Sequence, residues 1–242
     1  MDGQMIYHFM GCSTFAEYAV LASISLAKIN PDSNPYQACV LGCGIPTGWG
    51  AVYNNPNFHA NSSVAVWGLG AVGLSVIQAA KAKGATRIYG IDINEGKFPI
   101  AKEFGATHCV NPKDDARKFL LEHEKWGINF TYDCTGVVAV MRDALEMAHR
   151  GFGESMVIGV AAAGQELATR PFQLVTGRQW KGTAFGGWKS VEDVPKLSDK
   201  ILLGEMPVDK YITHTFEGLE KIQDLVDALK SGNCLRGVLK IG

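Results

Sequence analysis

The stretch SVAVWGLGAVGLSVIQAAKAKG, residues 63–84, decides the fold. Its first six residues predict a strand, and GLGAVG at 68–73 is a glycine-rich turn. The remainder predicts a helix that stops at a glycine. A membrane span needs about 20 apolar residues. The apolar run within this stretch, residues 64–80, is shorter and contains three glycines, Ser75 and Gln78. We therefore expect a strand, a turn and a helix, and no membrane insertion.

Outward from this stretch, short apolar runs alternate with helical patterns. Strands are predicted at 63–68, 87–93, 108–112, 129–136, 154–161 and 180–187, and helices at 71–84, 95–106, 113–125 and 137–151. Strands separated by helices pair in parallel, with helices on both faces of the sheet. The predicted fold class is therefore α/β, a doubly wound six-stranded parallel sheet of the Rossmann type.

The two flanks of the chain differ from this pattern. Residues 5–11 and 15–21 contain aromatic, strand-like pieces, and residues 190–242 predict two helices around YITHTF and a final strand, RGVLKI. We expect residues 1–45 and 188–242 to be parts of a second, mostly β domain. The nucleotide-type domain, residues 46–187, would be inserted between them.

Composition excludes several classes of function. A net charge of −1 argues against nucleic acid as a partner, because phosphate binding requires a basic excess. The six cysteines are scattered and form no CxxC pair, which is unlike a disulfide framework. No basic and apolar leader opens the sequence. These features indicate a reducing compartment, and we expect a cytoplasmic protein.

The turn at 68–73 matches G-x-G-x-x-G in its full context of strand, helix and a later acidic residue. Gly68 permits the tight turn, Gly70 lets the backbone approach a pyrophosphate, and Gly73 lets the helix pack close to the sheet. Asp92 ends the next strand and can accept hydrogen bonds from the adenosine ribose, which favours NAD over NADP. A structural glycine turn and a methyltransferase-type nucleotide fold are the alternatives.

Four segments resemble the zinc-dependent medium-chain alcohol dehydrogenases. They are LGCGIPTGWGA, GLGAVGLSVIQAAKAKGA, IDINEGKFPIAKEFGA and RPFQLVTGRQWKGTAFGGWKS. The resemblance is closest to class III, the S-(hydroxymethyl)glutathione or glutathione-dependent formaldehyde dehydrogenases, and it runs from residue 6 to 241. It implies that the sheet is inserted in a GroES-like catalytic domain, of which the chain holds a part.

The resemblance also implies roles for particular residues. Cys43 matches one ligand of the catalytic zinc; the other two ligands, the proton relay and the structural zinc lobe belong to a family segment that the chain lacks. Thr47 matches the catalytic-site threonine that packs against the nicotinamide, and Phe9 and Met10 match the substrate pocket. The implied cofactor-binding residues are Gly68, Gly70, Ala71, Val72, Gly73, Asp92, Lys97, Ile158, Val160, Thr183, Phe185 and Arg236.

A catalytic zinc needs three protein ligands and an open position, so Cys43 alone is an incomplete site. Cys12 and Cys39 have no ligand-like spacing, and we assign no chemistry to the six histidines. Pro46 replaces the family's usual serine and raises a question about the local backbone. From the residues alone, Lys97 and Arg236 could be solvated surface charges, Phe9 and Met10 core, and Cys43 a buried thiol.

The family reaction is zinc-assisted hydride transfer from S-(hydroxymethyl)glutathione to NAD, which removes formaldehyde, and the reduction of S-nitrosoglutathione is a second implied activity. The family forms homodimers through the edge of its nucleotide sheet, here around residues 170–187. A catalytically silent NAD-binding and dimerising fragment is the alternative. A zinc-free reductase, as among the quinone reductases, is disfavoured by the retained GCG.

Overall fold

The computed structural model describes residues 3–241 and divides into two compact units, each considered by itself. The first unit consists of residues 42–188, and the second of residues up to 41 together with those from 189 onward. None of the helices within residues 3–241 combines the length and apolar character that crossing a bilayer requires.

The unit of residues 42–188 is built on a parallel sheet of six strands. They are β1 (Ser63–Trp67), β2 (Arg87–Ile91), β3 (His108–Val110), β4 (Phe130–Asp133), β5 (Glu154–Val157) and β6 (Gln179–Gly182). Their spatial order is β3-β2-β1-β4-β5-β6, and all neighbours are parallel. This is the strand order of a dinucleotide-binding fold, so the predicted Rossmann sheet is confirmed.

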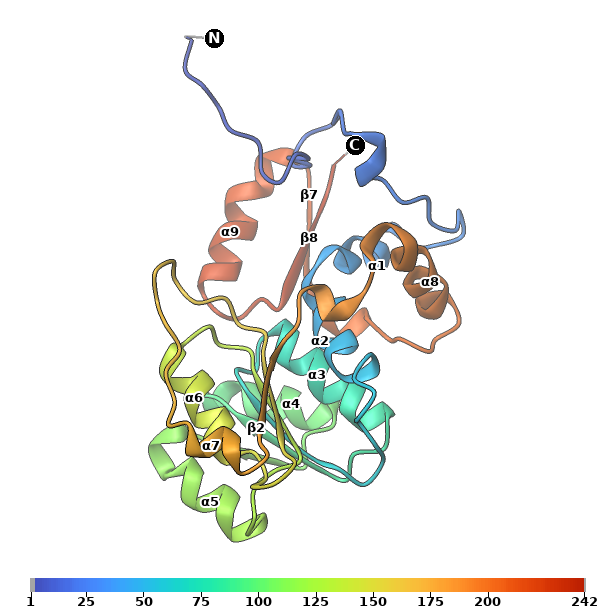
Figure 1. The fold of residues 1–242 in the computed structure, drawn as a ribbon. Coiled ribbons are helices and arrows are strands. Elements are labelled where there is room, and N and C mark those ends of the chain that lie inside the picture. The colour runs from blue at the N-terminus through green and yellow to red at the C-terminus, as the bar shows by residue number, and fades with distance from the viewer. Residues whose placement is uncertain (1–2, 242) are drawn as a thin grey trace. The chain divides into compact units, whose positions relative to one another are not determined.

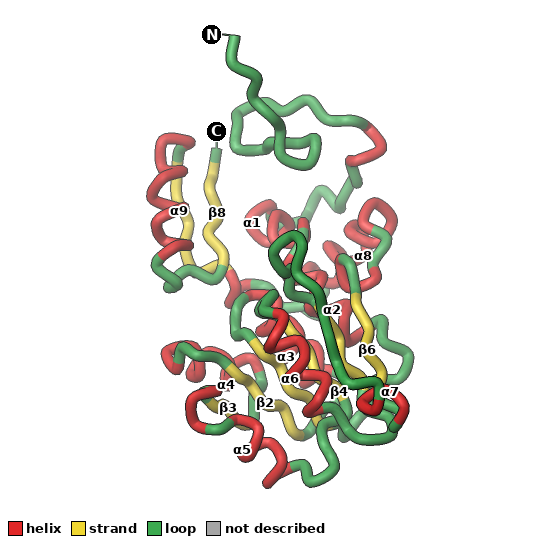
Figure 2. The backbone as a smooth tube through the Cα atoms, turned by 60° about the vertical axis from the view of Figure 1, so that its left-hand side comes forward, coloured by secondary structure: helices red, strands yellow, loops and turns green. Residues whose placement is uncertain are grey.

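Helices cover both faces of the sheet (Figures 1 and 2). The helices of this unit are α2 (Gly44–Tyr53), α3 (Ala71–Ala82), α4 (Phe98–Phe104), α5 (Ala116–His123), α6 (Val138–Met147) and the short α7 (Phe172–Val175), of which α3 to α6 pack on the sheet. On one face, residues of α5 and α6 pack with Trp67 of β1 and Tyr89 of β2 in a buried apolar cluster. On the other face, Gly73 of α3 lies against the side chain of Val66. Burial on both sides explains why the central strands read as continuous apolar runs.

The strands and helices of this unit are shorter than the ranges that the sequence patterns predict. The helix expected at 113–125 begins at Ala116, because Pro112–Asp114 form a 3₁₀ turn and Asp115 caps the helix with φ 54°. The strand expected at 154–161 ends at Val157, and the one at 180–187 is found at Gln179–Gly182. Beyond Val157, the backbone N–H groups of Ile158 and Gly159 instead donate to Asp133 O.

Helix α2 was not anticipated, because its sequence GIPTGWGAVY is rich in glycine and proline. Nine of its ten residues are buried. A Cβ on Gly48 would overlap Val72 O of α3, so this glycine permits the close approach of the two helices. Pro46 is the third residue of α2, a position where the backbone N–H lacks an intrahelical partner in any case. It therefore fits the helix, contrary to the question raised by the sequence.

The second unit contains α1 (Pro35–Ala38), α8 (Ser190–Leu202), β7 (Ile212–Glu217), α9 (Ile222–Lys230) and β8 (Arg236–Lys240). Strands β7 and β8 pair in parallel with an irregularity near His214. Residues 30–39 pack beside α8, where the Ser33 and Ser198 hydroxyls are 2.7 Å apart.

The strand-like pieces at 5–11 and 15–21 form no strand in the described chain, so that expectation is wrong. A strand requires a paired neighbour, and here the backbone turns instead, with Met10 at φ 52° and Ser13 at φ 47°. This unit is therefore mixed rather than mostly β within the described residues.

Candidate dinucleotide site

The glycine turn leads from the end of β1 into α3. Gly68 has φ 92° and donates its N–H to Ile91 O at 2.8 Å, which joins the turn to β2. A Cβ on Gly73 would overlap Gly68 O, whereas a Cβ on Gly70 would meet no atom within 4 Å. Gly68 is thus required by its backbone conformation, and Gly73 by packing. Gly70 instead borders open space at the N-terminus of α3, where unpaired backbone N–H groups favour an anion.

Asp92 lies directly after β2 and is nearly buried, with 7% of its surface exposed. Its Oδ2 accepts from Leu69 N at 2.8 Å and from Lys97 Nζ at 3.0 Å, and its Oδ1 accepts from Asn94 N at 2.9 Å. The carboxylate is therefore fixed against the glycine turn by both backbone and side-chain donors. The sequence placed Asp92 and Lys97 at the ribose; the structure brings the two together, and their contact with a ribose stays a prediction.

The strand order reverses direction between β1 and β4, which is where open α/β sheets bind ligands. At this point a Cβ on Gly68 would lie 3.0 Å from Cys134 O, so the turns that follow β1 and β4 are in contact. Thr135 and Gly136 form the second turn. The general rule for such sheets therefore places the expected binding crevice at the carboxyl ends of β1 and β4, beside the glycine turn.

Asp133 is fully buried and joins two turns of this crevice. Its carboxylate accepts from the Thr135 hydroxyl at 2.6 Å, from Thr135 N at 3.1 Å and from Gly136 N at 3.3 Å. Its backbone oxygen accepts from Ile158 N and Gly159 N, both at 3.0 Å. No sequence motif identified Asp133, and a carboxylate at the end of a buried strand was the available signal.

Several predicted nicotinamide residues lie near one another in the same unit. Gly186 lies against the backbone oxygens of Pro46 and Thr47, which brings the segment of Thr183 and Phe185 to α2. Thr47 is buried and donates its hydroxyl to Cys43 O at 2.7 Å. At the carboxyl end of the sheet, a Cβ on Gly136 would overlap the backbone of Val160, a residue that is 92% exposed. Ala71 is buried and Val72 half-buried in the first turn of α3.

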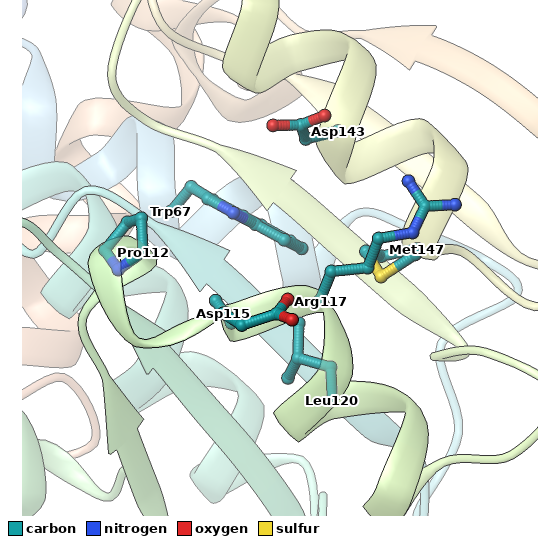
Figure 3. Close-up of a pocket in the computed structure, with 8 residues that line it drawn as sticks. Trp67, Pro112, Asp115, Arg117, Leu120, Asp143 and Met147 are labelled. Carbon is teal, nitrogen blue, oxygen red and sulfur yellow. The ribbon is translucent and has the colours of Figure 1, made fainter.

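A cavity of about 170 Å³ opens beside the glycine turn, on the face covered by α5 and α6. Trp67, the last residue of β1, extends its indole into this cavity (Figure 3). Its lining residues are Trp67, Pro112, Asp115, Ala116, Arg117, Leu120, Asp143 and Met147. The lining thus combines apolar side chains with two carboxylates and a guanidinium. Trp67 and Pro112 were not predicted as site residues.

Cys43 precedes α2 and is an exposed free thiol. Within residues 3–241, no group of three or more His, Cys, Asp or Glu side chains is arranged to hold a metal ion. Burial raises the pKa of Cys39 and, more strongly, that of Cys134, which opposes the thiolate form that metals bind. The described donors therefore do not fit a catalytic zinc.

Three predicted residues belong to the second unit. Arg236 begins β8 and is half-buried, while Phe9 and Met10 are 74% and 84% exposed. Their proposed contacts with cofactor and substrate stay predictions.

Comparison with known proteins assigns the family. Residues 71–202 match the family described as zinc-binding dehydrogenase, which is more than half of the chain. This chain belongs to the zinc-binding dehydrogenases. The matched range begins in the first turn of α3 and ends with α8, so it includes β2 to β6 and Asp92.

Relatives of this zinc-binding dehydrogenase carry specific names. An S-(hydroxymethyl)glutathione dehydrogenase of Photobacterium damsela subsp. piscicida is 51% identical over 99% of the chain, which covers 65% of that protein. An alcohol dehydrogenase class-3 of Caenorhabditis elegans is 54% identical over 98% of the chain, which covers 64% of that protein. The chain thus spans just under two thirds of the length of these relatives. The resemblance to class III is confirmed at the level of sequence.

Solved structures agree with the family. A benzyl alcohol dehydrogenase from Acinetobacter calcoaceticus superimposes with a TM-score of 0.87 at 30% identity, covering 96% of this chain and 64% of that one. An alcohol dehydrogenase zinc-binding domain protein from Burkholderia ambifaria also gives 0.87 at 30% identity, covering 97% and 63%.

Proposed function

We propose that the chain binds NAD in the crevice between β1 and β4, as the nucleotide-binding part of a class III alcohol dehydrogenase. The observation that carries this is the contrast between two glycines of the turn. A Cβ on Gly73 would overlap Gly68 O, whereas Gly70 faces open space at the start of α3. A pyrophosphate fits that space, because its charge is stabilised by the helix N-terminus. Asp92 would then accept hydrogen bonds from the ribose.

We extend the proposal to the rest of the cofactor. The adenine ring would pack on Trp67 and Pro112 in the cavity beside the turn. The nicotinamide would lie toward Thr47, with Ile158, Val160, Thr183 and Phe185 around it. Asp133 would act at a distance from NAD, by holding the turns of Gly136 and Ile158 in place.

The proposed reaction class is hydride transfer between an alcohol and NAD, and the proposed substrate is S-(hydroxymethyl)glutathione, after which the relatives are named. NAD supplies the hydride acceptor when bound. This chain's residues bind and orient the cofactor: backbone groups after Gly70 hold the pyrophosphate, and Thr47 supports the nicotinamide. The silent NAD-binding fragment is the second candidate, because the described donors do not form a metal site.

We also propose that the protein is a cytoplasmic homodimer. Phe172 and Val175 of α7 are 73% and 77% exposed directly before β6, which is an edge strand. An exposed apolar edge is a self-association surface. All six cysteines are free, which suits a reducing compartment.

Titration with NADH and NADPH tests the proposal on the wild-type chain and on Asp92→Asn. We expect wild type to prefer NADH, because the carboxylate repels a 2′-phosphate. In Asp92→Asn, Lys97 loses its partner carboxylate and can attract that phosphate. The ratio of the NADPH to the NADH dissociation constant should therefore fall by about tenfold, which corresponds to about 1.4 kcal/mol.

The ratio of the two dissociation constants, both measured on the same variant, is insensitive to a general loss of folded protein. Equal affinity of wild type for both dinucleotides, or no binding of either, would contradict the proposed site.

A further inference from the structure

His108 and His123 lie together at an end of the sheet that the dinucleotide crevice does not use. His108 is the first residue of β3 and His123 the last residue of α5. Their ring centres are 5.1 Å apart and their planes are inclined by 60°. The crevice lies at the carboxyl ends of the strands, whereas His108 marks the amino end of β3. This pair therefore needs its own explanation.

Hydrogen bonds engage Nδ1 of both rings. His123 Nδ1 lies 2.8 Å from Phe119 O, which can only accept, so Nδ1 carries the proton. His108 Nδ1 lies 2.9 Å from the Thr107 hydroxyl, which itself donates to Ile88 O at 3.0 Å. With the Thr107 hydroxyl proton on Ile88 O, His108 Nδ1 donates to Thr107, and each ring then has its lone pair on Nε2.

This arrangement is the one that metal-binding histidines adopt. A ligating imidazole characteristically donates its second N–H to a protein oxygen, which fixes the ring and leaves the other nitrogen for the metal. With Zn–N distances of about 2.0–2.1 Å and tetrahedral coordination, two rings sharing one zinc have centres roughly 5 Å apart. The observed spacing of 5.1 Å agrees with that value.

The surroundings leave the pair accessible. His123 is exposed and His108 half-buried. Glu124 accepts from Tyr89 OH at 3.0 Å and pairs with Arg87, so its Oε1 is already engaged.

We propose that His108 and His123 form a two-histidine site for a divalent transition-metal ion such as Zn²⁺ or Cu²⁺, each binding through Nε2. Imidazole nitrogen suits both ions. Since no third acidic, cysteine or histidine ligand joins them within residues 3–241, water completes the coordination. The ion would connect the start of β3 to the end of α5. This proposal does not depend on the proposed dehydrogenase function.

Calorimetric titration of the full chain with ZnCl₂ tests the site in wild type, His108→Ala, His123→Ala and the control His214→Ala. The control suits the comparison because His214 Nδ1 also bonds a threonine hydroxyl, Thr213, at 3.0 Å, but no second histidine ring is found beside it among the described ring contacts. We expect either test substitution to weaken one binding event by about 10–100-fold, as loss of a metal-supporting group does. His214→Ala should leave it unchanged.

Zinc that binds Cys43 or other thiols contributes equally to all four proteins and cancels in the comparison. Electron paramagnetic resonance with CuCl₂ gives an independent count, with two coordinating nitrogens expected in wild type and one in each single variant. Thermal denaturation without metal checks folding, and His108→Gln replaces His108→Ala if the alanine variant unfolds. Equal zinc affinity in wild type and the double variant, or a proton on Nε2 in the nitrogen NMR spectrum of either ring, would overturn the proposal.

Discussion

Single residues determine the shape of the crevice, and Asp133 shows how. It is fully buried, and its carboxylate and backbone oxygen together accept from Thr135, Gly136, Ile158 and Gly159. No cation pairs with that carboxylate in the described chain. Its oxygens instead accept hydrogen bonds from backbone N–H groups and from the Thr135 hydroxyl. The residue thus holds the two turns that follow β4 and β5.

We predict that Asp133→Asn lowers the free energy of unfolding by about 1–3 kcal/mol, the cost of leaving a buried donor unsatisfied. The asparagine amide keeps one acceptor oxygen but directs N–H groups toward other donors. Urea denaturation measures the change. The control Asp114→Asn alters an exposed carboxylate of the Pro112–Asp114 turn and should change stability by less than about 0.5 kcal/mol. Equal stability of Asp133→Asn and wild type would remove the structural role of Asp133.

At the scale of elements, α2 and α3 pack closely because small residues meet at their interface. Gly48 lies against Val72 O and the Ser75 side chain, and the Ser75 hydroxyl donates to Ile45 O at 2.6 Å. Gly50 approaches Gly186 and the Trp188 indole, whose N–H donates to Pro46 O at 2.9 Å. The segment of Thr183 and Phe185 is therefore tied to α2.

We predict that Gly48→Ala destabilises the fold by about 1–3 kcal/mol, because overpacking forces helices apart. This outcome opposes helix propensity, which by itself favours alanine by about 1 kcal/mol. The change in urea midpoint is the measurement. Gly70→Ala is the control, since a Cβ there meets no atom within 4 Å. If Gly48→Ala proved as stable as that control, the close contact of α2 with α3 would be wrong.

The sequence was sufficient for elements whose pattern is local. Strand β1, the glycine turn and α3 follow directly from residues 63–84, because apolar periodicity and glycine placement carry the same information. Helix α2 could not be predicted this way, since its glycines and Pro46 have low helix propensity and its stability comes from burial against α3 and residues 186–188. Tertiary packing outweighed propensity there.

The residues of the candidate site likewise divide into those that a local sequence motif predicts and those that only the folded structure reveals. Gly68, Gly70, Gly73 and Asp92 belong to one motif with fixed spacing, so the sequence could predict them as a site, and their contact with a dinucleotide stays a prediction. Asp133 acts on residues up to 26 positions away through its backbone oxygen, so only the assembled sheet reveals its role. The pieces at 5–11 and 15–21 have strand composition but no paired neighbour in the described chain, and composition alone cannot supply one.

At the scale of the whole molecule, sequence comparison establishes the family, whereas the structure shows which of its sites the described chain forms. The chain belongs to the zinc-binding dehydrogenases and covers just under two thirds of its named relatives. Its nucleotide unit forms a complete six-stranded sheet with the strand order of a dinucleotide-binding fold. The described donors form no metal site. Cofactor binding is therefore the property that this chain can be tested for by itself.

The most direct test is a fluorescence titration of the chain with NADH, comparing wild type with Gly70→Ala. The account predicts that wild type binds and that Gly70→Ala binds about tenfold more weakly or worse, since a clash of about 1.4 kcal/mol with the pyrophosphate is enough. The urea midpoint of Gly70→Ala should remain that of wild type, because its Cβ contacts nothing in the free protein. Absence of NADH binding by wild type, or unchanged affinity in Gly70→Ala, would contradict the claim that a dinucleotide occupies the space above Gly70.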